Sequence, residues 1–173
     1  MLQFHAFTTR SNGGLLNELI NDIGISFPFD PQTSTHNPKI FKVKALWDTG
    51  ATNCVITKQT AIKVGLKPFT KTKVFHAKGE SIENVYKLNL YLPNGIALSN
   101  INATECEDAE RFGFIIGMNV INLGDFSITN VAGNTVFSFR FPSIKEIDYV
   151  KESSQSFKQQ RDRFLNKGRK KPK

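Results

Sequence analysis

Hydrophobic and polar residues alternate along much of the central chain, which is typical of half-buried β-strands. Residues 39–47 (KIFKVKALW) form one such run, and residues 85–92 (VYKLNLYL) form another. In the second run, four large side chains share one face by the two-residue period: Tyr86, Leu88, Leu90 and Leu92. The pair Asn94-Gly95 then predicts a tight hairpin turn, with the next strand running from residue 96 to about residue 104.

A further hairpin is expected just before this region. Its arms are residues 73–76 and 85–92, on either side of the polar tip AKGESIEN. Gly79 lies within that tip, and glycine adopts backbone conformations that other residues avoid. We therefore expect a mobile hairpin tip.

Signals for strands and turns recur over shorter segments between residues 114 and 141. Residues 114–116 (FII) predict a buried strand that ends at Gly117, and residues 118–123 suit a short helix that ends at Gly124. Two final strands are expected, separated by a turn that contains Gly133: residues 125–130 and 135–141.

Helical signals are few in the rest of the chain. Thr57 is a suitable N-cap for a helix over residues 58–64, and Gly65 would end it. Residues 15–23 space their apolar side chains as a helix does, whereas residues 23–29 look extended. Helix and strand therefore both stay open for this segment, and the following residues up to 38 are expected to be a loop.

Length and composition fit one folded domain with tails. The chain has 173 residues, of which 39% are hydrophobic and 22% charged, enough for a single core. We expect an N-terminal extension over residues 1–38 that holds a strand or a helix plus a loop. A folded β-rich domain over residues 39–142 and a polar tail over residues 143–173 would follow.

Charge is concentrated in the tail. The net charge is +8, and residues 158–173 carry eight Lys or Arg against one acid, Asp162, which leaves the remaining chain close to neutral. A helix over about residues 144–166 and disorder over residues 167–173 are expected. A basic end of this kind usually serves solubility; contact with nucleic acid through residues 158–173 is the alternative.

Several classes of protein are disfavoured. No apolar run approaches the roughly 18–20 residues that span a bilayer, and the N-terminus lacks a signal-peptide segment, so we expect a cytoplasmic protein that does not contact membranes. Cys54 and Cys106 are far apart, and the three histidines are scattered. We therefore expect neither a metal site nor a cofactor.

The sequence ALWDTGATNCVI holds the strongest candidate for chemistry. Its Asp48-Thr49-Gly50 follows the apolar pair Leu46-Trp47 and precedes Val55-Ile56. A carboxylate at the end of a hydrophobic strand costs several kcal/mol to bury unless partners compensate. Either Asp48 is a turn residue that binds nearby backbone amides, or it takes part in chemistry.

Three ordered motifs decide between these interpretations: ALWDTGATNCVI, the hairpin around Gly79, and FIIGMNVINLGDF. Together they resemble the retropepsins, the single-domain aspartic proteases of retroviral type, and in particular their bacterial and mobile-element members. The resemblance covers about residues 40–140 and implies an all-β acid-protease barrel with one or two short helices. It also implies a homodimer that meets across its active site and hydrolyses peptide or protein substrates.

The resemblance assigns a role to each motif. Asp48 would be catalytic, with an activated water held between the two Asp48 carboxylates of the dimer. The active-site loop would be supported by Thr49, Gly50, Ala51, Ile115, Ile116 and Gly117. The flap that binds substrate would contain Ala77, Lys78 and Gly79.

The chain departs from the retroviral pattern at two positions. Thr52 and Met118 stand where retroviral enzymes usually carry an acid and an arginine that pair. A second hypothesis is therefore a dimeric binding module of this fold with weak or absent proteolysis, whose basic tail holds nucleic acid or acidic partners. A third is a precursor that removes its own termini.

Overall fold

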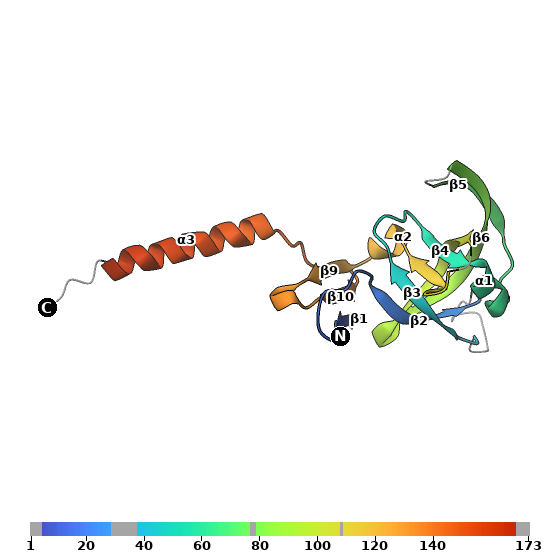
Figure 1. Ribbon diagram of the computed structural model, residues 1–173, viewed down its shortest axis with the longest axis horizontal. Coiled ribbons are helices and arrows are strands. Elements are labelled where there is room, and N and C mark those ends of the chain that lie inside the picture. Colours follow the sequence, from blue (N-terminus) through green and yellow to red (C-terminus); the bar gives the residue numbers. More distant parts are fainter. Residues whose placement is uncertain (1–4, 29–37, 77–78, 108, 169–173) are drawn as a thin grey trace. The chain divides into compact units, whose positions relative to one another are not determined.

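Strands make up most of the chain between His5 and Phe141 (Figure 1). The computed structural model describes residues 5–28, 38–76, 79–107 and 109–168. Contacts divide it into two units, Met1–Ser143 and Ile144–Lys173, each of which we describe by itself. The first unit contains β1 (His5–Arg10), β2 (Ile20–Ser26), β3 (Phe41–Trp47), β4 (Cys54–Thr57), α1 (Lys58–Val64), β5 (Thr70–His76), β6 (Gly79–Leu92), η1 (Pro93–Gly95), β7 (Ile96–Cys106), β8 (Phe114–Ile116), α2 (Met118–Ile121), β9 (Asp125–Thr129), η2 (Val131–Gly133) and β10 (Val136–Phe141).

Seven of these strands form one sheet, in the order β2-β3-β8-β4-β7-β6-β5. β2 also pairs with β6, through Gly24 opposite Tyr91 and Ile25 opposite Leu90. This pairing closes six strands into a barrel and leaves β5 outside it as the hairpin partner of β6. Closure removes the sheet edges that would otherwise be open. The predicted all-β, single-domain barrel with short helices is confirmed.

A second sheet has three antiparallel strands, in the order β1-β10-β9. Its inner face meets the barrel at Trp47, the last residue of β3, which is 5% exposed. The Trp47 ring lies 5.0 Å from that of Phe139 and 5.1 Å from that of Phe137. Aromatic pairs at this spacing are stabilising beyond the area that they bury. The cluster therefore fixes β3 one residue before Asp48.

Two local predictions are confirmed. The Thr57 side chain accepts a hydrogen bond from the Thr60 backbone N–H, and α1 ends at Gly65 with φ +82°. Asn94 and Gly95 both have positive φ in the turn between β6 and β7. These features follow from a few adjacent residues, so the sequence alone was sufficient to predict them.

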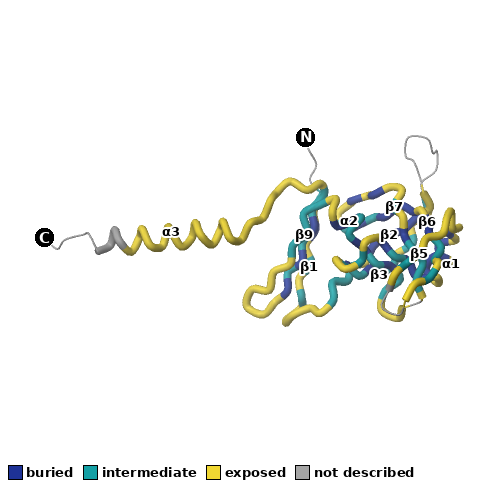
Figure 2. Tube along the Cα trace, turned by 90° about the horizontal axis from the view of Figure 1, so that it is seen from above, coloured by how far each residue is buried: buried dark blue, intermediate teal, exposed yellow. Residues whose placement is uncertain are grey.

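The hairpin tip is shorter than the predicted AKGESIEN, and its mobility stays a prediction. β5 and β6 pair from Thr70 opposite Val85 to His76 opposite Gly79, so residues 79–84 of the expected tip belong to a strand. One cross-strand contact in the extension is the ion pair in which Lys73 Nζ lies 2.6 Å from Glu80 Oε2. Figure 2 colours most of β5 as exposed.

The N-terminal segment for which the sequence allows both helix and strand is partly strand. Residues 20–26 form β2, with Ile23 and Ile25 buried, and the unexpected β1 precedes it. Both strands pair with partners far along the chain, so local spacing could not show them. The predicted domain limits at residues 39 and 142 stay a prediction. Most of the expected loop up to residue 38 lies outside the described residues.

The second unit contains one helix, α3 (Tyr149–Gly168), near the predicted range. Every side chain described in it, up to residue 164, is exposed (Figure 2). Disorder was expected for residues 167–173. Residues 167 and 168 belong to α3, and residues 169–173 lie outside the described residues. In the described part of the chain, no helix has the length and apolar character needed to cross a membrane.

Candidate active site

Asp48 lies at the start of the loop that joins β3 to β4, and β8 lies between these two strands. Trp47 of β3 is opposite Ile116 in a parallel pair, and Val55 of β4 is opposite Ile115 in an antiparallel pair. The loop must therefore pass across the end of β8. The Asp48 backbone N–H donates to the Ile116 carbonyl at 3.0 Å. This bond to β8 thus fixes the point at which the chain leaves the sheet at Asp48.

Gly117 brings the chain after β8 against this loop. A Cβ on Gly117 would lie 2.3 Å from the Asn53 carbonyl oxygen and 2.8 Å from that of Ala51, so a side chain does not fit. The next residue, Met118, donates its N–H to Ala51 at 2.8 Å. Close backbone packing of this kind is a reason for glycine at a position.

The Asp48 carboxylate is half-buried and held on one side. Its Oδ1 accepts a hydrogen bond from the Gly50 backbone N–H at 2.8 Å. With the described residues, Oδ2 makes no hydrogen bond. Thr49 and Gly50 are exposed. The bond to Gly50 is one that a turn aspartate also makes, so this contact alone does not identify a catalytic group.

Asn119 supports the loop, although no sequence pattern indicates it. Its Oδ1 accepts from the Cys54 N–H at 2.8 Å, and its Nδ2 donates to the Asn102 carbonyl at 3.3 Å. Its backbone N–H donates to Thr52 at 3.1 Å. One amide side chain therefore joins α2 to β4 and β7. The three partners are distant in sequence, so no spacing rule could have found them.

Trp47 is anchored by the N-terminal strands. Its backbone N–H donates to the Leu19 carbonyl at 2.9 Å, and its ring Nε1–H donates to Asn21 Oδ1 at 3.0 Å. Asn21 in turn donates to Thr9 Oγ1 at 2.8 Å. A buried indole N–H needs such a partner. The residue before Asp48 is therefore fixed by packing and by hydrogen bonds.

A groove of about 650 Å³ lies between the loop after Asp48 and the β5–β6 hairpin. We call it the loop–hairpin groove. It is lined by residues 50–53, Val55, residues 72–75, Ser81, Glu83 and residues 104–107. Gly79 begins β6 with φ +127° and has open space around it. The expected flap residues Ala77 and Lys78 lie outside the described residues.

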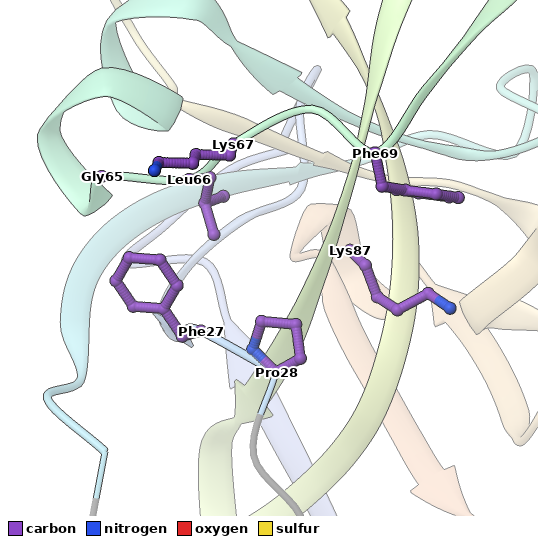
Figure 3. Close-up of a pocket in the computed structure, with 7 residues that line it drawn as sticks. All are labelled: Phe27, Pro28, Gly65, Leu66, Lys67, Phe69 and Lys87. Atoms are coloured by element: carbon purple, nitrogen blue, oxygen red, sulfur yellow. The ribbon is translucent and has the colours of Figure 1, made fainter.

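A second hollow, of about 540 Å³, lies elsewhere on the first unit (Figure 3). In that view Phe27 and Pro28 lie on one side, and Phe69 and Lys87 lie on the other. Lys87 Nζ is 5.1 Å from the centre of the Phe69 ring. The described residues that line this hollow include no carboxylate, thiol or imidazole and no residue of the Asp48 loop, so we do not choose it as the candidate active site.

Cys54 lies fully buried directly after the loop. Burial raises the pKa of its thiol to about 11, although hydrogen bonds with Gly117 and Asn119 act in the opposite direction. A neutral thiol is a poor nucleophile. Among the described residues, no three His, Cys, Asp or Glu gather to hold a metal ion. Asp48 therefore stays the candidate for chemistry at this site.

Residues 37–123 match the family model described as "gag-polyprotein putative aspartyl protease", and this range is half of the chain. The chain belongs to this aspartyl protease family. The match contains the Asp48 loop, the β5–β6 hairpin and Ile115 to Gly117. The resemblance to retropepsin-like aspartic proteases that the sequence motifs indicated is confirmed.

Two solved structures are similar to this aspartyl protease chain at low sequence identity. A retropepsin-like aspartic protease from Rickettsia conorii has a TM-score of 0.48 and 16% identity, over 82% of this chain and 98% of that one. The retroviral protease-like domain of Ddi1 from Leishmania major has a TM-score of 0.41 and 18% identity, over 73% of this chain and 95% of that one. No curated protein sequence matches the chain at a significant level.

Proposed function

We propose that the protein is an aspartic endopeptidase that cleaves extended peptides as a homodimer, with one Asp48 from each copy. The observation that carries the proposal is the position of Asp48 at the end of β3, hydrogen-bonded through its backbone to β8. The chain has a single Asp-Thr-Gly. A two-fold dimer brings two identical loops together, which is how one copy of a motif yields two carboxylates.

The chemistry requires this pair of carboxylates. Two carboxyl groups a few ångströms apart cannot both ionise, so they share one proton, as in the well-known aspartic-protease dyad. The ionised Asp48 takes a proton from water while the protonated Asp48 polarises the scissile carbonyl. The Gly50 N–H holds Oδ1 in place, which leaves Oδ2 of each copy to face the water and the other carboxyl.

The surrounding residues receive supporting roles in this proposal. Thr49, exposed beside Asp48, would hydrogen-bond across the two-fold axis, and the segment from Ile115 to Gly117 would exclude water from below. The β5–β6 hairpin, including Ala77, Lys78 and Gly79, would be the flap that closes over a peptide. The peptide would bind through its main chain as an added strand.

Substitution of Asp48 tests this proposal. With an unstructured protein as substrate, Asp48→Asn should reduce cleavage by at least roughly a hundredfold, and a statine-type inhibitor should have the same effect on the unaltered protein. The matched control is Asp22→Asn, since Asp22 is a highly exposed carboxylate whose partner Lys44 lies 3.8 Å away. Cleavage that continues unchanged in Asp48→Asn would show that another group, or a contaminant, does the chemistry.

A second candidate function is favoured by α3, which exposes all of its described side chains. This helix carries five Lys or Arg against Glu152 and Asp162. A dimeric binding module could hold nucleic acid or an acidic partner through it, in the cytoplasm that we propose as its compartment. Neither Cys54 nor Cys106 forms a disulfide, which fits that compartment.

Affinity measured against salt separates the two functions. Binding through phosphate contacts should weaken steeply as salt rises, and should be lost when residues 158–173 are deleted. Binding at full strength without these residues, or without a salt slope, would contradict the second candidate.

A further inference from the structure

The two faces of the β5–β6 hairpin differ in character. Thr72 is opposite Glu83 and Val74 is opposite Ser81, so these four side chains share one face. In β6, residues 81 and 83 line the loop–hairpin groove, whereas residues 80 and 82 do not. The four residues on the opposite face are Lys73, Phe75, Glu80 and Ile82, of which Lys73 and Phe75 also line the groove. Glu83 therefore lies on the groove face of the hairpin.

Among the described residues, none places a compensating charge beside Glu83 on this face. It is half-buried and makes no hydrogen bond or ion pair with the described residues. The neighbouring positions are neutral: Thr72 lies opposite, and Val85, two residues on, is opposite Thr104. A carboxylate that is partly removed from water without a partner favours the approach of a cation.

The other charged residues around the groove do not neutralise the charge of Glu83. Lys73 is the cation among the lining residues, and its Nζ lies 2.6 Å from Glu80. Glu105 accepts hydrogen bonds from the Tyr86 hydroxyl and from Asn84 Nδ2, on the face opposite to that of Glu83. Glu107, at the end of β7, is exposed. The described residues that line the groove thus carry more negative than positive charge.

We propose that the loop–hairpin groove selects peptides with a lysine or arginine side chain, and that Glu83 is the residue that recognises it. The inference rests on the proposed function in one respect, namely that a peptide lies in this groove. Along a peptide added as an extra strand, alternate side chains point to the same side. One of them would reach Glu83, where an ammonium or guanidinium group gains a charge-assisted bond and an acidic side chain is repelled.

Cleavage of a random decapeptide mixture by the full chain tests the proposal. Mass spectrometry of the products should show Lys and Arg enriched at one fixed distance from the cut. For a defined peptide with Lys there, kcat/KM should exceed that of its Gln counterpart by roughly ten- to a hundredfold. Glu83→Gln should abolish this preference, and Glu83→Lys should favour Glu at the same position. Glu110→Gln, which removes the same charge from an exposed loop outside the groove, should retain the preference.

Binding to Asp48→Asn separates this inference from the protease proposal. Fluorescence anisotropy should show tighter binding of the Lys peptide than of the Gln peptide, and equal binding once Glu83→Gln is added. A Lys preference in binding without cleavage by the unaltered chain would contradict the protease proposal and support the inference. Cleavage without a charge preference, or a preference that survives Glu83→Gln, would overturn the inference. Absence of both binding and cleavage would overturn both.

Discussion

At the residue scale, Gly117 shows how tightly the loop after Asp48 is packed. Its Cα faces the Asn53 and Ala51 carbonyl groups, where a methyl group would be within 2.8 Å of both oxygens. These are backbone atoms, so they cannot rotate away as a side chain would. The position of Asp48 therefore depends on an absent side chain more than 60 positions further along the chain.

Replacement of Gly117 by alanine should displace this loop. Overpacking of a close contact costs about 1–3 kcal/mol, so we expect a lower Tm and a larger loss of peptidase activity than the stability change explains. Differential scanning calorimetry and kcat/KM on one defined peptide would measure both. An alanine variant with unchanged Tm and unchanged activity would contradict the packing described here.

Tyr86 gives a prediction for alkaline pH. Burial, followed by the hydrogen bond to Glu105 and the charge of that carboxylate, raises the pKa of Tyr86 from 10 to about 12. Between these values the unfolded chain loses the phenolic proton and the folded chain keeps it, so stability must fall as pH rises. The loss should be roughly 2–3 kcal/mol across this window.

Urea unfolding at several pH values between 9 and 12 would measure this effect. In Tyr86→Phe the free energy of unfolding should fall less steeply over the same range, because the titrating group is absent. Equal slopes in both proteins would contradict the proposed linkage.

At the scale of elements, local structure was predictable and the pairing of distant strands was not. The cap at Thr57 and the turn at Asn94-Gly95 each depend on a few adjacent residues, and the structure has them as expected. The insertion of β8 between β3 and β4 joins segments that are far apart along the chain, such as Trp47 with Ile116 and Val55 with Ile115. The resemblance to a known family linked Ile115, Ile116 and Gly117 with the Asp48 loop, but it did not predict the order of the strands. β1 had no local signal because its partner is β10.

Substitution of Asn119 tests how distant elements are held together, because this residue joins α2 to β4 and β7. Asn119→Ala would leave the buried Cys54 N–H without its acceptor, which costs about 1–3 kcal/mol. Asn119→Asp keeps that acceptor and loses the donor to Asn102, so its stability should be intermediate. Denaturant unfolding of the three proteins measures the series. If Asn119→Ala is as stable as the unaltered chain, these contacts do not support the loop.

At the scale of the whole molecule, the proposed function needs more than one chain. Each copy supplies one Asp48, a loop held by β8, and a hairpin beside a groove. Thr52 and Met118 replace the acid and arginine that pair in retroviral enzymes, so dimer contacts must come from other residues.

Mixing of active and inactive chains tests the shared active site most directly. Unaltered and Asp48→Asn proteins are combined in equal amounts, allowed to exchange, and assayed at constant total concentration. If each active site needs Asp48 from both chains, a random mixture retains about a quarter of the activity of the unaltered protein. Activity of about one half would mean that each chain works with its own Asp48, and would contradict the account.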